Sequence, residues 1–344
     1  MSDDAQKPVN PFAAWQQLLR ERLYLLISNL HPMLRADVER AFQERGKLLF
    51  DPPDNSASDV SRPAGSWPLL TLLIAQHISP DIDTTFAASV AIATECFVCA
   101  LDLLDDVEDE DQTLIISEIG RARALNISTT LLALAQQAIL SSAQQGIDTK
   151  YILRLLDILQ QSTLVATGGQ HRDLLAEQRA ASDLTREECI EIAAAKAGAI
   201  IRLACLFGAI CANASEAECM ELAEMGELLG IAHQLDNDSH DLYYLIQSKN
   251  ASSGLPAERS VKSDLARGKK TLPIVLAAKS RKPLQEQGEI SDEEKQGYLL
   301  ALNEGIMTTW GISLLYRERA HERLRVISSR RSLAPELRLL LGFE

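Results

Sequence analysis

Aromatic residues and strand-like patterns are scarce in this chain of 344 residues. Phe, Trp and Tyr together make up 5% of it, although 46% is hydrophobic, so aliphatic side chains carry most of the apolar character. No stretch shows convincing alternation of apolar and polar residues, which argues against a β-rich fold. The abundance of Ala and Leu favours helix–helix packing, and the length is sufficient for a large core.

Basic residues are also in short supply. The chain has 34 Lys and Arg against 48 Asp and Glu, a formal net charge of −14. Nucleic-acid binding depends largely on Lys and Arg at phosphates, so that class is disfavoured, and we expect a soluble cytoplasmic protein. The N-terminal residues lack a basic flank followed by an apolar segment, so we expect no signal peptide. Glu95 and Asp102 interrupt the most apolar window, residues 86–104, so we expect no membrane span.

Cysteine does not point to a metal or redox centre. Two of the six cysteines, Cys96 and Cys99, form a CxxC, but no second CxxC or His pair follows at zinc-finger spacing. The pair also lies within an apolar helical pattern. We therefore interpret these cysteines as small buried hydrophobic residues.

Helical periodicity runs through almost the whole chain. Apolar residues recur at i, i+3, i+4 and i+7 in residues 14–30, 129–144 and 151–167. Gly, Pro and Ser gather instead in residues 50–68, 248–258 and 279–294, which we predict to be loops. The sequence predicts an all-α fold in which residues 1–344 form one domain of ten or more helices.

A dense acidic cluster follows the most apolar segment. Seven of the ten residues from Asp102 to Asp111 are Asp or Glu. On a helix Asp105 and Asp109 share a face, with Asp106 beside them. Two carboxylates about 4 Å apart repel by roughly 4 kcal/mol at an effective dielectric constant near 20. Such a cluster must therefore bind cations, shift its pKa values or remain solvated at a helix end, and all three are open at this point.

A second apolar helix, residues 226–245, ends in a similar cluster. Asn237 and Asp241 are spaced i and i+4, Asp238 lies between them, and Asp236 flanks the group. Carboxylate and amide oxygens suit Mg²⁺, a hard cation that usually binds phosphates as well. Two such helices facing each other across a bundle would hold a diphosphate through bridging metal ions.

The two clusters resemble the aspartate-rich motifs of the trans-isoprenyl diphosphate synthase (polyprenyl synthetase) superfamily. Residues 105–109 match its DDxxD motif. Its second motif, FQxxDDxxD, is similar to residues 233–241, with His233 in place of Phe and Asn237 in place of the first Asp. Four further stretches resemble the family in the expected order: residues 119–135, 168–174, 196–209 and 263–273. The resemblance covers roughly residues 65–325.

The resemblance implies an all-α isoprenoid-synthase fold around a deep central pocket and a Mg²⁺-dependent reaction, with three ions bound together with the diphosphate of an allylic prenyl substrate. The residues implied for metal binding are Asp105, Asp106, Asp109, Asn237, Asp238 and Asp241. Those implied for the substrate diphosphate are Lys196, Lys269, Gln234 and Arg172. Asp105, Asp106, Asp109, Lys196 and Gln234 would be catalytic, and a homodimer is expected.

By the same resemblance, the helix preceding the first motif should line the tunnel for the prenyl chain. Ala100 and Leu101 precede Asp105 by five and four residues, and neither is aromatic. Their size permits a chain of C15 or longer. Phe97, one turn further from the motif, could instead close the tunnel.

The chain also departs from the chain-elongating members of the family. Their GGKxxRP motif for isopentenyl diphosphate has only a remnant at Arg62 and Pro63, where Asp59 replaces the lysine. The Arg pair that follows the first motif in those members is absent before Arg121. A second diphosphate would then lie beside Glu and Asp, which is unfavourable.

Three functions therefore stay open. The favoured one is prenyl transfer, with an acceptor that need not be isopentenyl diphosphate. The NDxxD motif and residues 263–273 are similar to those of bacterial isoprenyl transferases that modify a peptide pheromone. The alternative is a terpene synthase of the same fold that acts on one prenyl diphosphate. A non-catalytic partner subunit is disfavoured because Asp105 and Asp109 are both present.

Overall fold

All regular secondary structure in the described part of the chain is helical. The computed structural model describes residues 10–44, 46–50, 63–250, 269–280 and 292–343. Its α-helices are α1 (Ala13–Ile27), α2 (Pro32–Gln43), α3 (Ser66–Ile78), α4 (Thr84–Glu108), α5 (Leu114–Ile119), α6 (Arg121–Leu140), α7 (Thr149–Glu177), α8 (Arg186–Ala193), α9 (Ala199–Cys211), α10 (Glu216–Asn250), α12 (Leu272–Ser280), α13 (Asp292–Arg330) and α14 (Pro335–Leu341). The predicted all-α fold of ten or more helices is confirmed.

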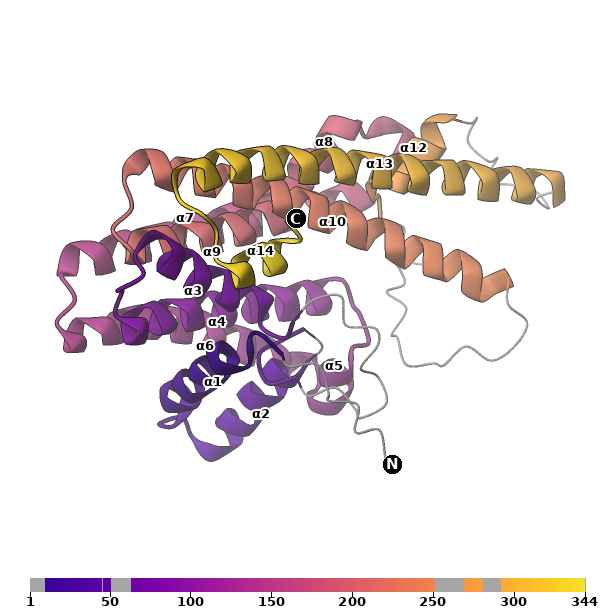
Figure 1. The fold of residues 1–344 in the computed structure, drawn as a ribbon. Helices are drawn as coiled ribbons and strands as arrows, with labels where there is room; N and C mark the ends of the chain where they lie inside the picture. Colours follow the sequence, from indigo (N-terminus) through magenta and orange to yellow (C-terminus); the bar gives the residue numbers. More distant parts are fainter. Residues whose placement is uncertain (1–9, 45, 51–62, 251–268, 281–291, 344) are drawn as a thin grey trace, which may run out of the picture.

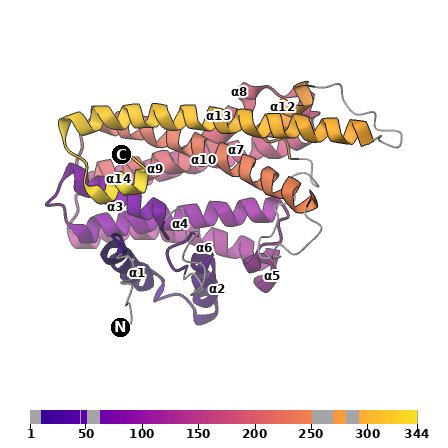
Figure 2. The same cartoon turned by 45° about the vertical axis from the view of Figure 1, so that its right-hand side comes forward.

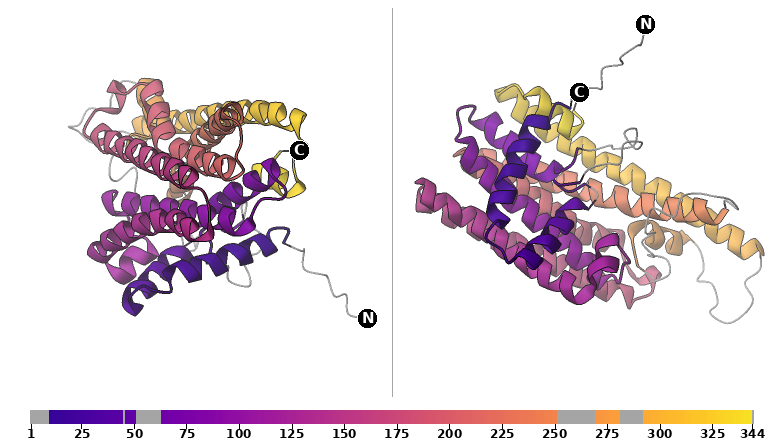
Figure 3. Two further views of the ribbon diagram at one scale, coloured as in Figure 1. Left: turned by 90° about the vertical axis from the view of Figure 1, so that its left-hand side faces the viewer. Right: turned by 90° about the horizontal axis from the view of Figure 1, so that it is seen from below.

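The long helices form a bundle with α4 inside it. α13 and α10 run side by side along one side and extend beyond the other helices, whereas α1 and α2 cover the opposite side below α4 and α6 (Figures 1 and 2). Figure 3 shows the same bundle end-on and from below. One large cluster of buried side chains extends from Phe12 to Leu337, and two smaller clusters lie around α10, α12 and α13. This arrangement is what a single domain requires, and the domain division itself stays a prediction.

Local signals in the sequence fix several helix starts. Asp83 and Asp148 accept hydrogen bonds from the backbone N–H groups of Thr85 (2.8 Å) and Lys150 (2.9 Å), which would otherwise be unsatisfied. Thr185 and Glu188 form a reciprocal capping box at the start of α8. Caps of this type stabilise a helix by about 1 kcal/mol each.

α4 is buried around its whole circumference from Phe86 to Ala100, which explains its predominantly apolar sequence. Cys96 and Cys99 lie in this part, and all six cysteines are buried free thiols. The helix ends at the acidic cluster, because Glu110 takes a left-handed conformation with φ of 57°. The carboxylates of the cluster therefore lie at the point where a buried helix reaches the surface of a cavity.

Three helical stretches are long and apolar enough to cross a membrane by length and composition. They are Thr84–Glu108, Arg121–Gln144 and Arg186–Cys211. Within the protein, 83%, 44% and 72% of their apolar windows are buried. Packing inside the bundle accounts for most of the hydropathy of the first and third, and the expectation of no membrane span stays a prediction.

A π-helical turn separates α8 from α9. It spans Ala194–Gly198 and contains Lys196. Glycines of two neighbouring helices make room for it, since a Cβ built on Gly169 of α7 would lie 2.7 Å from Cβ of Ala195, and one on Gly230 of α10 would lie 2.4 Å from O of Ala197. Turns of this type inside helices are frequent at functional sites. The close packing fixes the position from which the Lys196 side chain extends.

Two adjacent glycines of α7 allow a matched test of this packing. We expect Gly169→Ala to lower the free energy of unfolding by about 1–3 kcal/mol, because the added methyl group collides with Ala195 and the backbone of the π turn. Gly168→Ala is the control, since its Cβ would meet nothing within 4 Å. That substitution should stabilise the helix by up to about 1 kcal/mol. Equal stabilities of the two variants in urea unfolding would contradict the role of Gly169.

Candidate functional site

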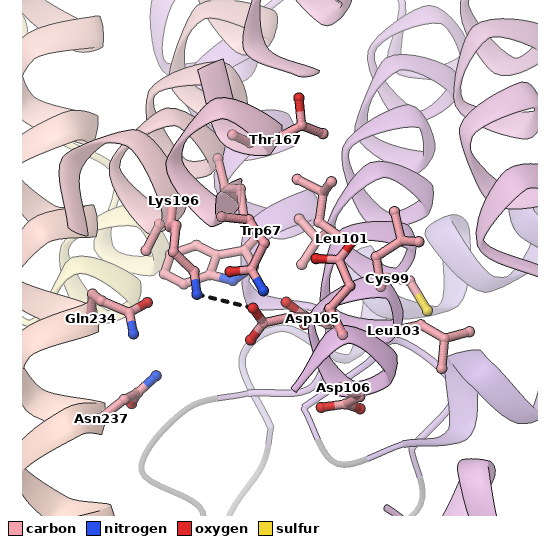
Figure 4. Close-up of a pocket in the computed structure, with 18 of the residues that line it drawn as sticks. Trp67, Cys99, Leu101, Leu103, Asp105, Asp106, Thr167, Lys196, Gln234 and Asn237 are labelled. Atoms are coloured by element: carbon pink, nitrogen blue, oxygen red, sulfur yellow. Dashed lines mark hydrogen bonds and ion pairs between the residues drawn. The ribbon is translucent and has the colours of Figure 1, made fainter. Parts of the chain in front are cut away.

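A cavity of about 460 Å³ lies between α4, α7, the π-helical turn and α10. Aliphatic and sulfur-containing side chains form much of its wall, including Val98, Cys99, Leu101, Ile200 and Ile201. Polar side chains of α4 and α10 face each other across it, as Figure 4 shows for Asp105 and Asp106 on one side and Gln234 and Asn237 on the other. The predicted clusters from distant parts of the sequence therefore lie at one cavity.

Lys196 connects the first acidic cluster to α7. Its Nζ lies 3.0 Å from Oδ1 of Asp105 and 2.8 Å from Oδ2 of Asp173 (Figure 4 shows the first contact). Burial alone would lower the pKa of Lys196, but the attraction of Asp105 and Asp173 outweighs it, and the pKa is raised. Lys196 therefore stays protonated, as its predicted role at a diphosphate requires. Asp173, which the sequence interpretation left without a role, is the residue that holds it on the α7 side.

Asp109 forms a second, more deeply buried pair. It is 1% exposed and makes an ion pair with Lys269, which precedes α12. Gln170 Nε2 also donates to Asp109 Oδ1 at 3.3 Å. The structure thus brings together Asp109, which was predicted to bind metal, and Lys269, which was predicted to bind the diphosphate. Residues 263–268, which precede Lys269 in the same motif, lie outside the described residues.

The second motif lies on α10 opposite the first. Gln234 and Asn237 line the cavity. Gln234 Nε2 donates to Asp238 Oδ1 at 2.9 Å, one turn further along the helix. Asp238 and Asp241 are not among the residues that line the cavity. Their predicted metal-binding roles stay predictions.

Asp236 has a partner set of its own. Ser313 Oγ of α13 donates to Asp236 Oδ1 at 2.6 Å, and Arg317 forms an ion pair with the other oxygen. These contacts join α10 to α13. They orient Asp236 toward α13, whereas His233, Gln234 and Asn237 of the same turn line the cavity.

Other predicted residues lie away from the cavity surface. Arg172 is half-exposed and bonds Glu191 at 2.8 Å on the outer side of the bundle. Phe97 and Ala100 are fully buried in the core, whereas Leu101 lines the cavity. The diphosphate role of Arg172 and the chain-length roles of these three residues stay predictions. Arg62 and Asp59 lie outside the described residues.

A third charged group was not predicted from the sequence. Lys47, in the segment between α2 and α3, lines the cavity and forms an ion pair with Asp102 of α4. Glu95, buried beneath this pair, accepts a hydrogen bond from the backbone N–H of Leu48 at 2.6 Å. Glu44 also lines the cavity and accepts from the backbone N–H of Ile115 at 3.0 Å. In the sequence, the one feature that could have pointed to this charged group is the position of Asp102 in the acidic cluster.

Two rings close the cavity near α3 and α10. The indole of Trp67 and the imidazole of His233 meet edge-on, with ring centroids 5.4 Å apart. His233 stands where the resembled family has Phe, so the aromatic character of that position is retained.

Glu95 should make stability depend on pH. Burial raises the pKa of Glu95 from an ordinary 4.5 to about 7, although Lys47 and the N–H of Leu48 oppose the shift. A carboxyl whose pKa is higher in the folded chain stabilises the fold fully below its unfolded pKa, and this contribution is lost as pH rises through the folded pKa. We therefore expect a loss of up to about 3 kcal/mol from this group between about pH 4.5 and 7.5.

Urea unfolding at several pH values checks this expectation. Glu95→Gln should flatten the dependence of the unfolding free energy on pH across that window. Glu21→Gln, at an exposed position of α1, is the matched control and should leave the wild-type dependence intact. An unchanged slope in Glu95→Gln would show that Glu95 does not titrate there.

Comparison with known proteins agrees with this geometry. The family model described as Polyprenyl synthetase matches residues 66–298. A short chain isoprenyl diphosphate synthase of Methanothermobacter thermautotrophicus is 30% identical over 215 residues, covering 61% of each chain. The tryptophan prenyltransferase ComQ of Bacillus spizizenii is 32% identical over 155 residues, covering 45% of this chain and 50% of its own. Both matches span less than two thirds of the relative's length.

Solved structures share the fold across the whole chain. The polyprenyl synthetase from Streptomyces coelicolor A3(2) superposes with a TM-score of 0.71 at 22% identity, covering 96% of this chain and 97% of its own. At that identity the likeness concerns the fold alone. The family match extends over more than half of the chain and includes both aspartate-containing helices, so the chain belongs to the polyprenyl synthetase family.

Proposed function

We propose that this protein is a Mg²⁺-dependent enzyme that ionises an allylic prenyl diphosphate and transfers the prenyl group. The observation that carries the proposal is the combination at one cavity of Asp105, Asp106 and Lys196 with Gln234 and Asn237, beside apolar side chains that form another part of its wall. The charged residues suit a diphosphate and its metal ions, and the apolar wall suits a prenyl chain. The cytoplasm is the proposed location.

The oxygen donors present fit Mg²⁺ that is shared with a ligand. Among the described residues, no group of three or more His, Cys, Asp and Glu could hold a metal ion by itself. Asp105, Asp106 and Asn237 nevertheless present oxygens from two facing helices. Mg²⁺ usually binds through one or two carboxylates together with phosphate oxygens and water, which matches this set. Bound there, it would draw negative charge from the departing diphosphate.

The chain's own residues supply the remaining stabilisation. The C–O bond of an allylic diphosphate breaks when the negative charge left on the diphosphate is stabilised. Lys196 and Lys269, now paired with Asp105 and Asp109, would move to diphosphate oxygens as these carboxylates turn to metal. Gln234 would donate its amide N–H beside them. The apolar wall would keep water from the allylic cation.

The acceptor is proposed to be a group other than isopentenyl diphosphate. Five carboxylates line the cavity against two lysines: Glu44, Asp102, Asp105, Asp106 and Glu108 against Lys47 and Lys196. Mg²⁺ and the first diphosphate would contact the lining residues that face α10, Asp105, Asp106 and Lys196. The region left for the second substrate is therefore rich in carboxylates. A relative named as a tryptophan prenyltransferase supports an acceptor of a different kind.

Release of a product from one substrate is the second candidate. The same ionisation, followed by cyclisation or capture of water, would make the protein a terpene synthase. The aliphatic wall around Leu101, Ile200 and Ile201 supports a pocket that could fold a prenyl chain. It does not by itself favour cyclisation over transfer.

A homodimer is proposed as the assembly. Leu125 and Leu140 of α6 and Leu153, Leu164 and Val165 of α7 are exposed aliphatic side chains, which would be buried between two copies. Sedimentation equilibrium measures the mass directly, and a monomer at micromolar concentration would contradict this proposal.

Removing one carboxylate tests the ionisation site. We expect Asp105→Ala to lower diphosphate release by roughly 100-fold or more, since it removes a metal donor and the partner of Lys196. Asp157→Ala is the matched control, because Asp157 is an exposed carboxylate of α7 that bonds only Gln161 among the hydrogen bonds described. Both variants should keep the wild-type circular dichroism spectrum. Near-wild-type activity of Asp105→Ala with every prenyl diphosphate would contradict the proposed site.

A product assay distinguishes the candidate reactions. Geranyl, farnesyl and geranylgeranyl diphosphate are each supplied with Mg²⁺, with and without isopentenyl diphosphate, and parallel reactions contain EDTA. If the enzyme transfers the prenyl group to another acceptor, no prenyl diphosphate of greater chain length should form, with or without isopentenyl diphosphate. EDTA should abolish all release of diphosphate. Longer diphosphates that need isopentenyl diphosphate would overturn the acceptor proposal. A hydrocarbon or alcohol from one substrate would establish the terpene synthase.

A further inference from the structure

The polar group around Lys47 lies on the same helix as the ionisation site but one turn earlier. Asp102 precedes Asp105 by three residues and Asp106 by four, so the two groups are roughly 5 Å apart along the α4 axis. Both Lys47 and Asp102 line the same cavity as Asp105. A second substrate that approaches the allylic cation from this side would therefore contact this group.

Lys47 would be suited to bind an anion if its charge were available. Its side chain is only 12% exposed, yet its ammonium group reaches the cavity surface. Burial, the largest single effect, lowers the pKa of Lys47, but the attraction of Asp102, Cys99 and Glu95 together outweighs it. The pKa is therefore raised and the lysine is charged. Asp102 matches that charge on the cavity side, whereas Glu95 on the core side is itself charged only above its raised pKa of about 7.

The other described residues that line the cavity beside Lys47 include an acidic side chain and several apolar ones. Glu44 comes from the end of α2, and burial raises its pKa in spite of the hydrogen bond from Ile115. Ala41, Val98 and Ile115 supply apolar surface beside it. Among the described residues of this region, a diphosphate placed here would face Glu44 and Asp102 with Lys47 as the cation, whose charge Asp102 already matches, which is unfavourable.

Resting on the proposed function, we infer that Asp102 determines acceptor specificity. By neutralising the charge of Lys47, Asp102 makes this end of the cavity unfavourable for a second diphosphate. The same end is then suited to an uncharged or cationic acceptor. Apolar surface beside carboxylate oxygens fits a partly apolar group that carries N–H or O–H donors. Asp102 acts through Lys47 and touches no reacting atom, so it is a specificity-determining residue.

Calorimetry on three proteins tests this inference: the wild type, Asp102→Asn and Asp102→Glu. The Asp102 side chain is 53% exposed, so neither substitution should disturb the fold. Each protein is first saturated with Mg²⁺ and a farnesyl thiolodiphosphate, which resists ionisation, and isopentenyl diphosphate is then titrated. We expect Asp102→Asn to bind isopentenyl diphosphate roughly tenfold more tightly than the other two, because one carboxylate near the phosphate groups has been removed.

The double variant Lys47→Met, Asp102→Asn isolates the lysine. If the gained affinity comes from freeing the charge of Lys47, this variant should lose it. Equal affinities of Asp102→Asn and Asp102→Glu would overturn the inference, as would tight binding of isopentenyl diphosphate to the wild type. Retention of the full gain in the double variant would also overturn it.

Binding of the thiolodiphosphate tests the proposed function separately from the role of Asp102. If the thiolodiphosphate does not bind the wild type with Mg²⁺, the ionisation site is wrong. The isopentenyl diphosphate titrations are then compared on the free proteins, where the difference between Asp102→Asn and Asp102→Glu still reports on Asp102 alone.

Discussion

The structure depends on balancing concentrated negative charge at the end of a buried helix. α4 is buried around its circumference from Phe86 to Ala100, and it ends in closely spaced carboxylates. Lys196 and Lys269 come from distant parts of the sequence to pair with Asp105 and Asp109. In the proposed reaction, a diphosphate would replace the carboxylates as partners of these lysines, and Mg²⁺ would replace the lysines as partners of the carboxylates. Structural stability and the proposed chemistry therefore rely on the same ion pairs.

Backbone geometry decides whether that balance is possible. Lys196 extends from a π-helical turn, and the turn fits because Gly169 and Gly230 let α7 and α10 approach its backbone. On the opposite side, Ser313 and Arg317 of α13 hold Asp236. These contacts orient α10 so that Gln234 and Asn237 face α4. Side chains that touch no substrate thus set the width and the charge of the cavity.

Two charged groups one helical turn apart divide the cavity in two. At Asp105 and Asp109 the lysines would exchange partners if the proposed diphosphate and metal ions bind. Lys47 is instead paired with Asp102, which lies one helical turn before the first aspartate-rich motif. The same residue types therefore favour an anion at one end of the cavity and disfavour a second anion at the other. This asymmetry is consistent with a prenyl acceptor that carries no phosphate.

The sequence alone determined the helical fold and the two helices that carry the aspartate-rich motifs. The expectation that the second helix ends at its cluster is wrong, because α10 continues past Asp241 to Asn250. Apolar periodicity fixes which helix faces are buried, and the spacing of Asp105 and Asp109 is a local property of a helix. It also identified Lys196 and Lys269 through motif resemblance. Only the tertiary structure decided that Asp173 shares Lys196, that Arg172 turns to Glu191 and that Lys47 reaches Asp102. Those pairings join residues 19 to 55 positions apart, and they depend on helix packing that no local pattern encodes.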